Sequence, residues 1–102
     1  MTRPVQHPAW CDRLRCGATP RSPGGTHCSR VVVLGPYPPS TVVAEVSLAQ
    51  SAPIPGYPGS GHPFVALALG ETGEDLSLTP LPVELATALG RVLTSLLCEV
   101  RG

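Results

Sequence analysis

Two cysteines and two histidines lie near the start of the chain at a spacing suited to one metal ion. They are His7, Cys11, Cys16 and His27, separated by three, four and ten residues. Zinc prefers thiolate and imidazole ligands in a tetrahedral arrangement, which two Cys and two His supply. Since four protein ligands leave no position for water, we expect a structural ion rather than a catalytic one.

The identity of the fourth ligand is open between two adjacent residues. Cys28 follows His27 directly, and neighbouring side chains of an extended segment point to opposite faces. We therefore do not expect both on one ion, and we favour His27. The spacing also departs from the common zinc-finger pattern, in which the second pair of ligands is a pair of His.

The cysteines also admit interpretations without a metal. They could be free buried thiols, or they could form a Cys11–Cys16 or Cys28–Cys98 disulfide, because their even number permits pairing. A reversible Cys11–Cys16 bond would make the chain a thiol redox sensor. No apolar secretory run follows Arg3, so we expect the cytoplasm, where disulfides are rare. The segment could also be disordered.

Charge is unevenly distributed along a chain whose net charge is zero. Residues 1–30 carry five Arg against one Asp, whereas residues 31–102 carry two Arg against six acidic residues. A basic lobe of this kind can steer a protein toward nucleic acid or an acidic partner. Five Arg without interleaved aromatic side chains make a small footprint, so a nucleic-acid-associated regulator is only an alternative. It would use Arg13, Arg15, Arg21 and Arg30.

Alternating apolar side chains predict a small antiparallel sheet after residue 30. The expected strands are residues 30–35, 41–49, 64–70 and 75–78, with 64–78 forming a hairpin. Seven Pro and Gly residues lie between 50 and 63. We interpret that stretch as a flexible hairpin connection.

The C-terminal segment predicts an amphipathic helix. Thr79 is a suitable N-cap, and Pro80 and Pro82 would fall in the first turn, where no N–H is needed. Apolar residues then recur at steps of three and four and form one stripe. We expect this stripe to cover one face of the sheet. Its members are Leu81, Leu85, Leu89, Val92, Leu93 and Leu96.

These elements predict an α+β fold, in which a small antiparallel sheet of three to four strands is packed by one C-terminal helix. An irregular Cys/His knuckle at 1–29 would join a body at 30–102 in one compact domain. No apolar run approaches the roughly 20 residues of a membrane span. No Ser–His–Asp order, phosphate-binding Gly loop or pair of carboxylates stands out. We expect a non-enzymatic, zinc-stabilised binding or regulatory module of unknown partner, protein or nucleic acid.

The N-terminal motif also resembles that of a known group of proteins. His-Pro-Ala-Trp-Cys at 7–11, Arg15-Cys16 and His27-Cys28-Ser29 are similar to a pattern in small proteins of high-GC Gram-positive bacteria. Those proteins combine H-P-x-W-C, a second Cys and H-x-S with a β-rich body and a leucine-rich helix introduced by Leu-Thr, as at Leu78-Thr79 here. The resemblance implies His7, Cys11, Cys16 and His27 as ligands, leaves Cys28 incidental and implies no activity.

Overall fold

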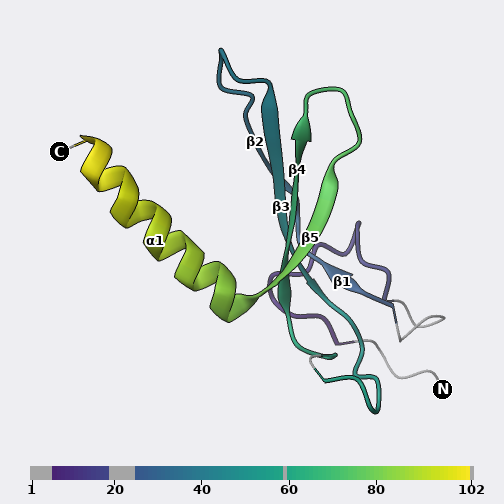
Figure 1. Cartoon of the computed structure of the whole chain (residues 1–102). Coiled ribbons are helices and arrows are strands. Elements are labelled where there is room, and N and C mark those ends of the chain that lie inside the picture. Colours follow the sequence, from purple (N-terminus) through teal and green to yellow (C-terminus); the bar gives the residue numbers. More distant parts are fainter. Residues whose placement is uncertain (1–5, 19–24, 59, 102) are drawn as a thin grey trace.

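The computed structural model describes residues 6–18, 25–58 and 60–101 as a knuckle, a sheet and a helix (Figure 1). The elements are β1 (His27–Cys28), β2 (Val32–Leu34), β3 (Val42–Gln50), β4 (Phe64–Glu71), β5 (Ser77–Pro82) and α1 (Val83–Arg101). All strand pairs are antiparallel, so the α+β class is confirmed. The sheet has five strands rather than three or four, because the knuckle contributes β1.

The first two strands lie end to end along the same edge of β3. Cys28 faces Ala49 and Val32 faces Val46, so four steps along one strand match three along the other. This mismatch is a β-bulge with one extra residue. It separates β1, which was not predicted, from β2, which lies within the expected strand at 30–35.

Ser29 completes the hydrogen bonding at this bulge. Its amide donates to the Leu48 carbonyl over 2.8 Å, and the Leu48 amide donates back to the Ser29 hydroxyl over 2.7 Å. The side chain thus replaces the carbonyl that the bulge turns away. Ser29 is only 8% exposed, so these bonds are shielded from water and attach the knuckle to the sheet.

The hairpin expected at 64–78 is present, but its second strand continues further than expected. β5 runs to Pro82, and Pro80 lies opposite Ala66 in the ladder. The prediction that Thr79 caps a helix and that both prolines lie in its first turn is therefore wrong. Because β5 is an edge strand, the backbone nitrogen of Pro80, which lacks a hydrogen, can face solvent. The sheet is therefore not broken at this position.

The two faces of the sheet differ in composition. We call one the aliphatic face. The other mixes Glu45, Ser47 and the buried Ala66 and Ala68 with larger apolar side chains, which are Val33, Val43, Phe64 and Leu78. In the described part of the chain the buried apolar residues are all alanines, and no large side chain is fully buried. The aliphatic face comprises Val32, Leu34, Val42, Ala44, Val46, Leu48, Val65, Leu67, Leu69 and Leu81.

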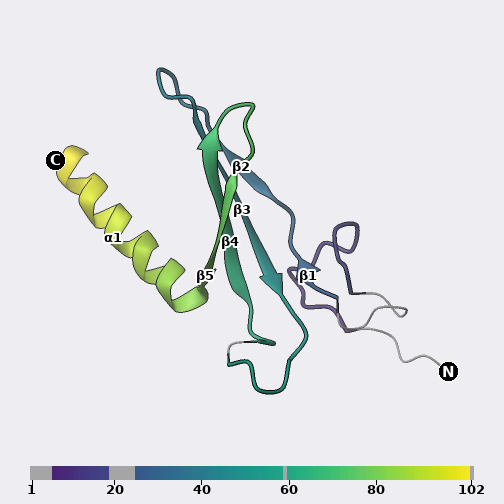
Figure 2. The same ribbon diagram turned by 45° about the vertical axis from the view of Figure 1, so that its right-hand side comes forward.

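The helix does not pack on the sheet, contrary to the prediction. α1 diverges from the end of β5 and leaves the sheet at an angle, as both views show (Figures 1 and 2). None of its residues is buried, and Leu85, Val92 and Leu96 are each more than half exposed. The physical reason is the junction: β5 ends at Pro82 and the helix begins at Val83, so no loop exists to turn the helix back.

Candidate metal centre

Backbone turns in the knuckle arrange three of the four expected ligands. The Cys11 amide donates to the Pro8 carbonyl over 3.0 Å, which places Cys11 one turn after His7. The Arg15 amide donates to the Asp12 carbonyl over 3.0 Å, and the Leu14 amide donates to the Asp12 carboxylate over 3.0 Å. This second turn brings Cys16 back toward Cys11.

Two further backbone bonds join the knuckle to β1 and place the fourth ligand. The Asp12 amide donates to the Cys28 carbonyl over 2.8 Å, and the Gly17 amide donates to the Thr26 carbonyl over 2.9 Å. His27 lies between these two bonds. Its imidazole is thereby held beside both cysteine sulfurs, within hydrogen-bonding distance of each.

The distances between the four side chains match a tetrahedral metal site. One ligand atom from each of His7, Cys11, Cys16 and His27 lies within 4.8 Å of all the others. The four sulfur to Nδ1 distances are 3.3, 3.5, 3.6 and 3.7 Å. A zinc tetrahedron with ordinary bond lengths requires a sulfur to nitrogen edge of about 3.6 Å. The group is therefore able to hold a metal ion.

Hydrogen bonding among these groups explains the cluster less well than an ion does. The Cys11 and Cys16 thiols carry one proton each, so they can donate only two hydrogen bonds to the imidazoles. Four short sulfur to nitrogen contacts are present. A single cation at the centre satisfies all four, because each contact is then an edge of its coordination shell.

The protonation states of the group without a metal are set by its partial burial. Desolvation raises the pKa of the Cys11 thiol, and the neighbouring Cys16 raises it further. Desolvation, with smaller effects of Arg13 and His27, lowers the pKa of His7. The imidazole is therefore neutral and ready to bind a cation, whereas the thiol must release a proton.

Two features on the far side of Cys16 complete the pocket around it. The Ala18 amide donates to the Cys16 sulfur over 3.3 Å, which helps to fix the position of this side chain. Gly25 packs directly against Gly17: a Cβ on Gly25 would lie 2.0 Å from the Gly17 carbonyl oxygen. No side chain fits at this position. The hydrogen bonds between Ser29 and Leu48 were not predicted from the sequence, because they depend on the bulge between β1 and β2.

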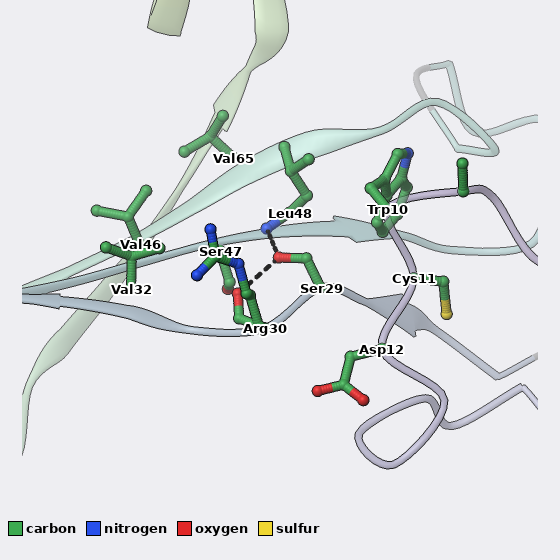
Figure 3. A pocket seen from close by; sticks show the side chains of 11 residues that line it. Trp10, Cys11, Asp12, Ser29, Arg30, Val32, Val46, Ser47, Leu48 and Val65 are labelled. Carbon is green, nitrogen blue, oxygen red and sulfur yellow. Dashed lines mark hydrogen bonds between the residues drawn. The ribbon is translucent and has the colours of Figure 1, made fainter.

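Trp10 and the aliphatic face line the same hollow. The hollow has a volume of about 580 Å³, and Leu48, Val65 and Arg30 also line it. Figure 3 shows Leu48 between Trp10 and Val65, with Ser29 bonded to Leu48. The knuckle thus approaches the aliphatic face at Trp10, next to Cys11.

The remaining candidate residues lie outside the cluster. Cys28 belongs to no ligand group, and its thiol lies 3.9 Å from the Thr26 carbonyl. All four cysteines are free thiols, so neither of the two alternative disulfides is present. Arg15 donates to the Ser29 carbonyl, Arg13 and Arg30 are exposed, and Arg21 lies outside the described residues.

Comparisons with known proteins add no assignment. No protein-family model matches the chain, and neither does any curated protein or solved structure. The resemblance to the small proteins of high-GC Gram-positive bacteria therefore stays a prediction. Among the described residues, no helix has the length and apolar character needed to cross a membrane.

Proposed function

We propose that the chain is a non-enzymatic binding module whose N-terminal knuckle is held by one structural zinc ion on His7, Cys11, Cys16 and His27. The observation that carries the proposal is the set of four sulfur to nitrogen distances of 3.3–3.7 Å, which are the edges of a zinc tetrahedron. Zinc in small knuckles contributes roughly 10–16 kcal/mol of apparent binding energy. That is comparable with the whole stability of a small domain, about 5–15 kcal/mol.

A structural role follows from the composition of the shell. Two thiolates and two imidazoles fill the tetrahedron, so no open position is left at which the ion could activate water. The ion would instead fix the knuckle on the sheet, with Arg13 and Arg30 exposed on it. We place the partner contact at this basic surface, and we place the protein in the cytoplasm.

Cobalt(II) titration of the metal-free protein tests the proposed shell. Tetrahedral coordination by two thiolates gives intense visible absorption and a sulfur-to-cobalt charge-transfer band, saturating at about one equivalent. Cys11→Ser removes a sulfur and should weaken the charge-transfer band. Cys28→Ser is the matched control and should leave both bands unchanged. Octahedral, weakly absorbing cobalt in the unaltered protein would refute the proposal.

The redox-sensor alternative is supported less well. Cys11 and Cys16 lie close enough to react, but the raised pKa of Cys11 keeps its thiol protonated, and the thiolate is the reactive form. Free-thiol counts that stay constant under mild peroxide would exclude it.

The nucleic-acid alternative has fewer free cations than the sequence suggested, because Arg15 is bonded to the Ser29 carbonyl. Binding to mixed DNA or RNA that weakens with salt would support it.

A further inference from the structure

The helix α1 carries an apolar seam along one side. Ala86, Leu89, Leu93, Leu96 and Val100 follow one another at alternating steps of three and four residues, which is the spacing of a helix that packs against a partner. The opposite side is polar: Thr87 and Thr94 hydroxyls donate to backbone carbonyls one turn earlier. The helix is about 28 Å long. Its seam is therefore long enough for a stable contact.

Nothing in the described part of the chain covers this seam. Ala86 is half-buried next to the sheet, but Leu89 is 40% exposed and Leu96 is 53% exposed. Both views show α1 diverging from the sheet along its length (Figures 1 and 2). In proteins most of the stability of a helix comes from packing of its amphipathic face, so a partner is needed to stabilise the seam.

The aliphatic face of the sheet is a second uncovered apolar surface. The Val42 and Leu69 side chains on this face are almost half exposed. Neither of them lines the hollow that Trp10 shares with Leu48 and Val65. The same chain thus presents an apolar helix and an apolar sheet surface, and its own geometry keeps them apart.

The exposed area is larger than a monomer of this mass should have. The chain exposes 7878 Å², whereas a folded monomer of 10.6 kDa is expected to expose about 5,500 Å². Its radius of gyration is 16.6 Å against about 13 Å for a compact domain of this length. Part of the difference belongs to irregular loops. The remainder is on the scale of the area that each chain loses in a permanent dimer, about 1,000–2,500 Å².

The charges on these surfaces allow two identical chains to meet. The helix carries Glu84 and Glu99 against Arg91 and Arg101, all on or beside its polar side, so its net charge is zero. The aliphatic face has no ionisable residue between its strand ends, where Glu71 pairs with Val42. A second copy would therefore meet no like-charge repulsion at either surface.

We propose that the occupant of both surfaces is a second copy of this chain. In a twofold dimer each helix lies over the aliphatic face of the partner, so one symmetric interface covers two seams and two faces. The helix cannot reach its own sheet in this way, because no loop separates β5 from α1. A complex with one molecule of a different protein would cover one seam and one face, whereas the dimer covers two of each.

Light scattering coupled to size exclusion, on the full zinc-loaded chain over a wide concentration range, tests the proposal. The expected mass is twice 10.6 kDa. The double variant Leu89→Gln/Leu96→Gln should weaken the dimer by about a hundredfold or more, because each removes a buried leucine. Ala88→Gln/Ser95→Gln places the same residues at the same spacing on the polar side, and it should stay dimeric.

The mass of the unaltered chain decides the proposal even if the seam variant fails to fold. A mass of 10.6 kDa at every concentration would overturn it, whether the helix then binds another protein or none. A seam variant that is folded by circular dichroism and remains as dimeric as its control would overturn it too, because the interface would then lie elsewhere.

Discussion

The N-terminal knuckle and the C-terminal helix depend on opposite kinds of stabilisation. The knuckle has almost no regular structure, yet turns, strand bonds and four converging ligands fix its geometry locally. The helix has fully regular structure, yet it has no buried residue. The contrast shows that regular secondary structure and tertiary stability are separate properties here. We propose a metal ion as the stabiliser of one region and a second chain as the stabiliser of the other.

Removing the metal should separate the two regions most clearly. The chain has one Trp, and Trp10 lies in the knuckle, so its fluorescence reports on that region alone. Far-UV circular dichroism reports mainly on α1. A strong chelator should shift the Trp10 emission to that of a solvated indole, while the helical signal changes little. Knuckle stability should fall by several kcal/mol, since most of the roughly 10 kcal/mol or more of metal binding is lost.

Restoring zinc is the control for this experiment, and it should return the fluorescence. A Trp10 emission that does not respond to the chelator, in a protein that had contained zinc, would show that the knuckle folds without the ion.

The contact between Gly25 and Gly17 should be the next most sensitive feature of the knuckle. Gly25→Ala forces a Cβ against the Gly17 backbone, because that Cβ would lie 2.0 Å from the Gly17 carbonyl oxygen. We expect zinc affinity to fall by at least about tenfold, comparable with losing a supporting contact of a metal ligand. Gly17→Ala is the matched control, since its Cβ would find ordinary contacts at 3.5 Å. Competition with a coloured zinc chelator measures both, and equal affinities would contradict the described packing.

The Ser29 side chain should contribute less, but at a defined place. Ser29→Ala leaves the Leu48 amide without its acceptor in a buried position, which costs about 1–3 kcal/mol. Ser40→Ala removes a similar bond, which the Val42 amide donates to the Ser40 hydroxyl, but in an exposed turn. We expect the exposed change to cost under about 0.5 kcal/mol. Urea unfolding of the zinc-loaded protein compares the two, and equal losses would refute the role of the bulge.

The parts of the fold that depend on local patterns could be predicted from the sequence. Alternation in Val42 to Leu48 and the hairpin near Gly73 indicated β3, β4 and β5, and the leucine spacing indicated α1. The position of Pro80 could not be settled locally, because proline suits both a helix start and an edge strand. The prediction that the helix packs on the sheet was wrong, because this packing depends on the junction at Val83, which periodicity does not describe.

The candidate site was predictable for a different reason. Ligand chemistry limits the choice of side chains, so His7, Cys11, Cys16 and His27 could be named before their positions were known. The expectation that only one of His27 and Cys28 binds the ion rested on the alternation of a strand, and β1 indeed spans these two residues. The supporting residues could not be named, because a close approach at Gly25 and a bulge at Ser29 arise only from pairing with distant segments.

Elemental analysis of the protein purified without chelator tests the central proposal most directly. We expect about one equivalent of zinc per chain, reduced by Cys16→Ser and unchanged by Cys28→Ser. Less than about a tenth of an equivalent, in unaltered protein whose Trp10 emission shows a folded knuckle, would contradict a zinc-held module.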